Sequence, residues 1–290
     1  MNSQSLAREH YSRADVQKEI ADFCVGRWVA VHCTTEKGEL VFRRYFKGRP
    51  LTVSNVSDLQ ELLRKMNFQA RTIYASANKY RLLSCIEDVH TLSNVIGCTP
   101  TWDIDSTLQE WRKTVAVAKQ IIAFLESQGI CNSVYVKWSG NGCHIHIHEE
   151  AFSEEVLSKA HPLDLAYAIV EYVNSNVLSR LSESLTMENV HVENRMDAGR
   201  VFTCPLSLHR ELDVVCVCMK PNELDNFSPE WIKPHSFRHN PQWREHVKGE
   251  ADKLALKAYE AVGGYPKSTV RKKRKKKSLD QQIIEWLQKF

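Results

Sequence analysis

Two aspartates in this sequence stand at a spacing that suits metal chemistry. Asp103 and Asp105 lie two positions apart in a stretch that resembles a strand. Residues i and i+2 of a strand point to the same side, so the carboxylates are expected side by side, with Trp102 and Ile104 buried opposite. Such a pair repels itself unless a hard cation lies between the oxygens. The stretch therefore predicts a cation site, with two solvated acids as the alternative.

A second stretch, Ser139-Gly140-Asn141-Gly142-Cys143-His144, follows about one helix and one strand later. Its two glycines let a backbone approach a ligand closely, and its serine and histidine can donate to phosphate oxygens. A tight hairpin turn is the plainer interpretation of Gly-x-Gly after a strand. Together with the carboxylates, however, a glycine-rich anion cradle is what nucleotidyl transfer requires.

Three histidines share one face of the strand after the glycines, at positions 144, 146 and 148. They span about 13–14 Å at ~3.3 Å per residue, too far for one zinc ion. We expect His144 to donate to phosphate and His146 and His148 to lie at the surface or in a groove. Lys137 and Trp138 are candidates for contact with a template, with a core position as the alternative for Trp138.

A third acid near the first two would complete a metal site. Glu193 and Asp197 are both candidates, and the local pattern does not choose between them. Arg200 and His209 add donors that suit a triphosphate. The segment that ends at His209 also fits an ordinary loop that enters a strand.

The net charge of +4 is unevenly distributed over the 290 residues. The run 271–277 carries +7, which leaves 4 − 7 = −3 for the rest. This run fits nucleic-acid contact and a plain linker equally well. No apolar run approaches the ~20 residues of a membrane span, and the first eight residues lack a secretory signal. We therefore expect an intracellular protein.

The nine cysteines contain no C-x-x-C pair. Convergence of Cys85, His90, Cys98, Cys216 and Cys218 on a zinc ion is conceivable, but the spacing fits no standard zinc module. We expect reduced, mostly buried thiols.

Periodicity predicts interspersed strands and helices without a clean βαβ alternation, which indicates an α+β fold. The predicted helices are 13–26, 56–66, 108–128, 162–183, 245–262 and 278–290. The predicted strands are 28–33, 40–45, 71–75, 95–105, 133–138, 143–148, 190–193, 200–203 and 214–219, and 221–243 is expected to be irregular.

The order of these motifs resembles the archaeo-eukaryotic primase superfamily, and most of all the small (catalytic) subunit of DNA primase. The order is Asp-x-Asp, Ser-Gly-x-Gly-x-His, an acid with Arg three residues later, and Pro-x-Ser-Leu-His at Pro205 to His209. The likeness runs from about Arg71 to Trp231. It implies a core with an RRM-like antiparallel or mixed sheet flanked by helices.

The resemblance also implies roles for individual residues. Asp103, Asp105 and Asp197 would bind two Mg²⁺ or Mn²⁺ ions. Glu193 competes with Asp197 for the third place but ranks second, because it matches the motif only with a gap. The residues implied in nucleotide or phosphate binding are Ser139, Gly140, Gly142, His144, Arg200, Ser207 and His209. Thr203 stands where the family often has Lys or Arg, which weakens triphosphate binding unless Arg200 or Arg210 compensates. The zinc module of many such subunits is not evident.

The implied activity is templated primer synthesis on single-stranded DNA from nucleoside triphosphates. Two alternatives stay open: a polymerase of end-joining repair or plasmid type that extends primers, and a non-catalytic nucleic-acid-binding replisome adaptor.

The expected organisation is a catalytic core at 1–245, divided into 13–95 and a motif-bearing 96–245. A helix at 246–264, a basic linker at 265–277 and an amphipathic helix at 278–290 follow. The last helix suits docking on a large primase subunit or a replication clamp, or on its own core.

Overall fold

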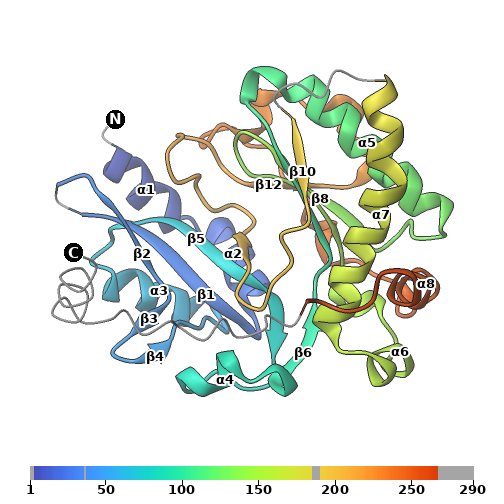
Figure 1. Ribbon diagram of the computed structural model, residues 1–290. Helices are drawn as coiled ribbons and strands as arrows, with labels where there is room; N and C mark the ends of the chain where they lie inside the picture. Colours follow the sequence, from blue (N-terminus) through green and yellow to red (C-terminus); the bar gives the residue numbers. More distant parts are fainter. Residues whose placement is uncertain (1–2, 36, 185–189, 267–290) are drawn as a thin grey trace, which may run out of the picture.

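The computed structural model describes residues 3–35, 37–184 and 190–266. They form two five-stranded antiparallel sheets and a separate two-stranded one, with helices around them (Figure 1). The α-helices are α1 Ser3–Ser12, α2 Ala14–Cys24, α3 Val56–Lys65, α4 Ile86–His90, α5 Trp111–Ser127, α6 Glu154–Lys159, α7 Pro162–Ser184 and α8 Asp252–Val262. The strands are β1 Arg27–Thr34, β2 Leu40–Arg43, β3 Tyr45–Phe46, β4 Arg49–Pro50, β5 Ala70–Tyr80, β6 Val95–Cys98, β7 Thr101–Asp105, β8 Val134–Trp138, β9 Cys143–Ile147, β10 His191–Glu193, β11 Val201–Thr203 and β12 Val217–Met219. None of the helices described is long and apolar enough to cross a membrane.

The first sheet has the order β11-β5-β1-β2, with β6 also paired to β5. Alternate residues of β1, such as Val29 and Val31, are buried in the main core, into which α1, α2 and α3 also pack. The opposite face of these strands carries His32 and Tyr74, which are only half-buried. One face of the first sheet is therefore covered by helices, and part of the other is open.

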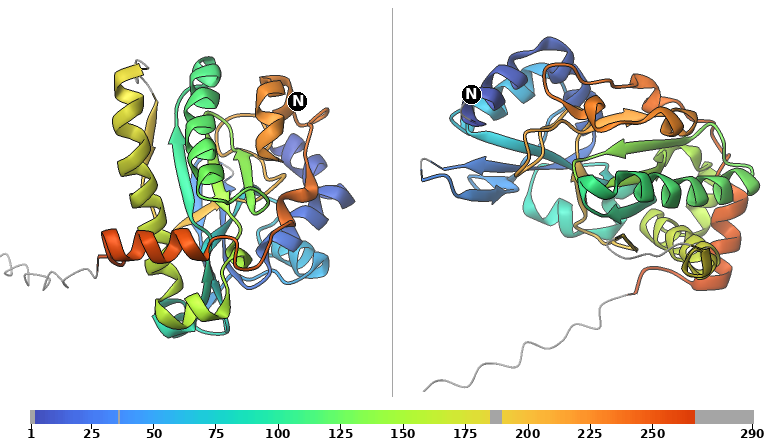
Figure 2. Two further views of the ribbon diagram at one scale, coloured as in Figure 1. Left: turned by 90° about the vertical axis from the view of Figure 1, so that its right-hand side faces the viewer. Right: turned by 90° about the horizontal axis from the view of Figure 1, so that it is seen from above.

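The second sheet has the order β10-β7-β9-β8-β12. Along the chain, β7, α5, β8, β9, α7 and β10 alternate as β-α-β-β-α-β, and their four strands lie in the order fourth, first, third, second. This is the arrangement of an RRM-like sheet, so that prediction is confirmed. Figure 2 shows α5 and α7 side by side on one face of this sheet.

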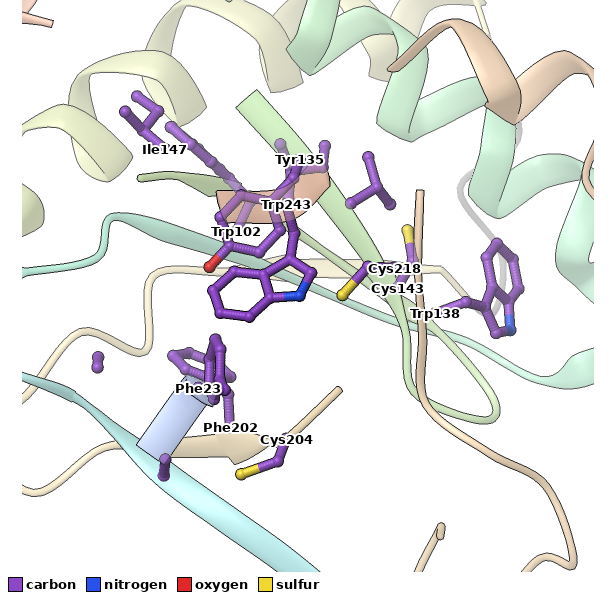
Figure 3. Packing of buried hydrophobic residues seen from close by; sticks show 14 of the residues in the cluster. Phe23, Trp102, Tyr135, Trp138, Cys143, Ile147, Phe202, Cys204, Cys218 and Trp243 are labelled. Carbon is purple, nitrogen blue, oxygen red and sulfur yellow. The ribbon is translucent and has the colours of Figure 1, made fainter. Parts of the chain in front are cut away.

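The second sheet holds its motif residues on the face that looks toward the first sheet. Trp102 and Ile104 of β7 are fully buried on the opposite face, as their alternation with the aspartates predicted. Between the sheets, Phe23, Phe202 and Cys204 share one interior (Figure 3). Lys137 of β8 lies in this interior and donates to the carbonyl of Thr203 at 2.9 Å, which joins the two sheets.

The α+β class and most predicted elements are confirmed, and the differences have local causes. Helix α1, which ends at Ser12, was not predicted. The predicted strand 95–105 is two strands, because Pro100 marks the crossing from β6 in the first sheet to β7 in the second. The predicted helix 245–262 begins only at Asp252. The basic linker from 267 and the predicted helix 278–290 lie outside the described residues.

Candidate active site

Three carboxylates come together where β7 and β10 pair. The register places Glu193 directly opposite Asp103, and His191 opposite Asp105. Directly opposed residues of an antiparallel pair share a face and bring their side chains within contact distance. Glu193 and Asp103 are therefore neighbours on the face that Asp105 also occupies.

The guanidinium of Arg195 lies among these three carboxylates. Its Nε is 2.9 Å from Oε2 of Glu193 and 3.6 Å from Oδ2 of Asp103, and its Nη2 is 3.0 Å from Oδ2 of Asp105. Burial opposes ionisation of Asp103, but His144 and Arg195 outweigh it and hold its pKa below the usual value. Burial and the charge of Asp103 raise the pKa of Asp105. The single positive charge of Arg195 thus interacts with three carboxylates.

Asp197 does not join this cluster. Its carboxylate lies 3.2 Å from Nη2 of Arg200 and accepts the backbone N–H of Gly199 at 2.7 Å. The next residue, Ala198, is held to the first sheet, because its carbonyl accepts from the side chain of Asn78. The chain leaves β10 after Glu193 and crosses toward β11. Among the described residues, the carboxylate beside the aspartate pair is therefore Glu193.

The glycine turn is fitted tightly to two other segments of the protein. A Cβ on Gly142 would lie 2.0 Å from the carbonyl oxygen of Ile104, and one on Gly140 would lie 2.6 Å from Cδ2 of His209. Gly140 also has φ of +136°, a conformation that side chains other than hydrogen rarely adopt. Because these glycines have no Cβ, the turn can pack directly against the aspartate strand on one side and against His209 on the other. These two contacts fix its position.

His144 links the turn to the carboxylates. Its Nε2 is 3.1 Å from Oδ1 of Asp103 and 3.5 Å from Oγ of Ser139. Its register on β9 places it between Asp103 of β7 and Lys137 of β8. The ring of Phe202 packs edge-on against it, with 5.0 Å between the ring centroids. His144 is thus held where its Nε2 orients Asp103 and adjoins Ser139, while its Nδ1 is buried and has no hydrogen-bond partner among the described residues.

His209 is a neutral donor at neutral pH. Burial and the nearby charge of Arg210 lower its pKa to about 4. Its Nδ1 accepts the backbone N–H groups of Glu211 and Leu212, so the ring proton is on Nε2. His209 therefore offers a hydrogen-bond donor, as expected, but no positive charge at neutral pH.

Ser207 and Arg200 are placed differently from His209. Ser207 is completely buried, and its Oγ accepts the backbone N–H of Ile73 and meets the hydroxyl of Tyr11. The structure therefore does not bring Ser207 to the site surface. Arg200 is held against the backbone of Arg195, since its Nε donates to the Arg195 carbonyl at 2.7 Å.

Four neighbours of the turn are interior residues. His146 is 1% exposed, stacks on Tyr135 and pairs through Nδ1 with the hydroxyl of Thr101. His148 is also buried and stacks on His246. The expectation of a position at the surface or in a groove is wrong for His146, whereas His148 lines a hollow beside Arg27 and Glu149.

Lys137 and Trp138 are also completely buried. Neither can contact a template, and Trp138 takes the core position by stacking on Phe227 with 4.0 Å between centroids.

The carboxylate oxygens are the ligand type that Mg²⁺ and Mn²⁺ prefer. Within residues 3–35, 37–184 and 190–266, however, no three His, Cys, Asp or Glu side chains are placed to hold a metal ion. The guanidinium of Arg195 lies among these acids, whose oxygens are nevertheless of the type that would hold such an ion. The sequence reasoning assigned no role to Arg195, although its position two residues after Glu193 was a usable signal. All nine cysteines are free thiols, and seven of them are buried.

Comparison with known proteins informs the fold alone. No protein-family model and no curated protein match the chain. Among solved structures, the polymerase domain of Ligase D from Mycobacterium tuberculosis, in complex with DNA, matches with a TM-score of 0.55 and 13% identity. The match covers 90% of this chain and 89% of that chain. The protein therefore has an α+β fold with antiparallel sheets, like that of the Ligase D polymerase domain.

Proposed function

We propose that the protein is a DNA-directed nucleotidyltransferase that synthesises primers on a single-stranded template by two-metal phosphoryl transfer. The observation that carries this proposal is the convergence of three carboxylates on one guanidinium, beside a glycine turn with phosphate donors. The polymerase-like fold supports it, and the Ligase D domain was solved with DNA. An intracellular location and the division of the core near residue 95 belong to the same proposal.

In this proposal, Asp103, Asp105 and Glu193 hold two Mg²⁺ or Mn²⁺ ions after Arg195 has moved aside. Bound there, the ions supply activation of a 3′-hydroxyl and neutralisation of the leaving pyrophosphate. We prefer Glu193 to Asp197 because only Glu193 has the β-sheet register with Asp103.

The triphosphate side of the site is made by hydrogen-bond donors. Ser139, His144 and the Nε2–H of His209 converge around the turn and would bind phosphate oxygens. Thr203 provides no positive charge, so Arg200 or Arg210 would supply it. Ser207 stabilises the interior and is left out of the proposed site.

A polymerisation assay tests the proposal. The full-length protein is incubated with Mn²⁺, a single-stranded template and labelled nucleotides of both sugar types. Asp103→Asn with Asp105→Asn should abolish synthesis while strand binding persists. Two single variants, Glu193→Gln and Asp197→Asn, identify the third acid. We expect the rate of synthesis to fall at least about 100-fold in Glu193→Gln and not in Asp197→Asn. Undiminished synthesis by the double aspartate variant would exclude this site.

The same assay separates primer synthesis from primer extension. Products made without a primer support a primase, whereas products that need a supplied primer support the polymerase of end-joining or plasmid type. The identical carboxylates would serve both reactions.

One observation favours a non-catalytic alternative. It is the ion pairing of Arg195 with the acids, and Thr203 at a position where the resemblance implies a basic residue is consistent with it, as in a binding module that has lost its chemistry. Metal-independent strand binding with no nucleotide incorporation under any metal would support that alternative.

A further inference from the structure

We propose that the open face of the first sheet binds single-stranded nucleic acid through three aromatic rings. The rings belong to His32 of β1, Phe42 of β2 and Tyr74 of β5, named here the ring platform. This inference rests on the proposed function, since it says where the template strand would lie. The interior side of the same strands packs on α1, α2 and α3, so the platform faces away from them.

The three rings support one another and leave one ring accessible. The centroid of the His32 ring lies 4.8 Å from that of Phe42 and 5.4 Å from that of Tyr74, and Phe42 and Tyr74 are 6.0 Å apart. The Nδ1 of His32 and the hydroxyl of Tyr74 are 2.9 Å apart, which fixes both rings. Phe42 is 45% exposed. A fixed, exposed aromatic ring on a strand is what stacks against an unpaired base.

Two arginines give this face charge that suits phosphates. Arg210 and its neighbour Glu211 both act on the two rings behind Phe42. Burial lowers the pKa of His32, Arg210 lowers it further and Glu211 opposes the change. Burial raises the pKa of Tyr74 to about 12, against the hydrogen bond with Thr72 and the charge of Arg210. Arg210 is exposed, although Glu211 lies 3.3 Å from its Nε.

At the other end of the same face, the guanidinium of Arg44 lies over the ring of Trp28, with Cζ 3.3 Å from the centroid. Its Nε and Nη2 are buried and have no hydrogen-bond partner among the described residues. Trp28 and His32 are four residues apart on β1, or about 13 Å at ~3.3 Å per residue. These buried nitrogens are out of reach of a phosphate oxygen, so Arg44 adds only positive charge at this distance from the platform, beside the negative charge of Asp197.

The platform is connected to the proposed catalytic site by two short paths. Thr203 of β11 pairs with Tyr74, and β11 packs over His144 through Phe202. His209 packs on the glycine turn, and the next residue is Arg210. A strand of nucleic acid held on the platform would thus pass next to the donors proposed for the triphosphate.

Binding of a labelled single-stranded oligonucleotide to the full-length protein, in EDTA and followed by fluorescence anisotropy, tests this inference. We expect Phe42→Ala to weaken binding at least about fivefold, as loss of one stacked base would, and Phe42→Tyr to bind as the parent does. Leu256→Ala, at a 37% exposed position of α8, is the matched control and should change nothing. Equal affinity of the parent protein and Phe42→Ala overturns the inference.

Photocrosslinking with a halogenated pyrimidine in the oligonucleotide gives an independent readout. Crosslinks should map to the peptides of β2 or β5, and crosslinks confined to other elements contradict the platform. Displacement of the strand by a nucleoside triphosphate alone would mark a nucleotide pocket instead, and would also overturn the inference.

The outcomes separate this inference from the proposed function. A protein that binds through Phe42 but incorporates no nucleotide keeps the platform and loses the enzyme. A protein that polymerises equally well with and without Phe42, with unchanged strand affinity, keeps the enzyme and loses the platform.

Discussion

At the scale of single residues, Arg195 decides the state of the acidic cluster. Asp103 is largely buried, whereas Glu193 and Asp105 are more than half exposed, and the guanidinium is within 3.0 Å of the last two. Three carboxylates at this separation repel one another when no cation is present. The guanidinium of Arg195 therefore offsets part of this repulsion from within the chain.

Arg195→Met should make the stability of the fold depend on divalent ions. In EDTA we expect the melting temperature to fall by about 2–4 °C, which corresponds to roughly 1 kcal/mol for a domain of this size. Added Mn²⁺ should raise the melting temperature of the variant by more than it raises that of the parent protein, because the guanidinium no longer lies between the acids. Thermal unfolding with and without Mn²⁺ measures both effects.

Arg210→Met is the matched control, since it removes an exposed arginine paired with a single acid. Its melting temperature should not depend on Mn²⁺ more than that of the parent. An Arg195→Met protein as stable as the parent in EDTA would show that the carboxylates do not need the guanidinium.

At the scale of elements, the glycine turn owes its place to one close backbone contact. Gly142 directly precedes β9 and lies against the end of β7, so that no Cβ fits between it and the carbonyl of Ile104. The distance from the turn to the aspartates is thus set by backbone atoms. Side-chain adjustment cannot relieve a change there.

Gly142→Ala should therefore destabilise the protein by about 1–3 kcal/mol, which is the usual range for overpacking of a packed element. Thermal or urea unfolding gives the value. Gly97→Ala is the control, because its added Cβ would have only ordinary contacts at 3.6 Å and longer. Similar stabilities of the two alanine variants would contradict this description of the turn.

At the scale of the whole molecule, Glu250 ties the segment before α8 to the second sheet. Its carboxylate accepts the backbone N–H groups of Cys131, Asn132 and Ser133 at 2.8–3.0 Å. Burial opposes its ionisation, but these hydrogen bonds outweigh it and lower the pKa of Glu250 to about 2. The stabilisation is complete above the unfolded-state pKa near 4.5 and is lost as the pH falls toward 2.

Glu250→Gln should remove this part of the acid sensitivity. Between pH 6 and about pH 3, the free energy of unfolding should fall less steeply in the variant than in the parent protein. Urea unfolding at several pH values measures the two slopes. Parallel slopes would mean that the hydrogen bonds of the carboxylate do not depend on its charge.

The part of the site that could be predicted is the part encoded by near neighbours. The i and i+2 rule placed Asp103 and Asp105 on one face, and the buried partners Trp102 and Ile104 fixed which face. Glu193 could not be chosen from the sequence, because its position depends on which strand pairs with β7 and in what register.

The same limit explains the errors at Ser207 and in α1. A Pro-x-Ser-Leu-His pattern does not show that Tyr11, nearly 200 residues away in the chain, covers the serine hydroxyl. Helix α1 has a polar sequence and only a few apolar residues, among them Leu6 and Ala7, so its burial depends on partners that periodicity does not reveal.

The first sheet takes its edge strand β11 from residues that follow the second sheet's β10. The part of the chain before β7 thus lacks one strand of its sheet, and β11 has its pairing partner in that part. Gene fusion, circular permutation or recombination could carry this unit into a new protein as a whole, but a crossover between the sheets would leave two fragments that each lack a neighbour to pair with.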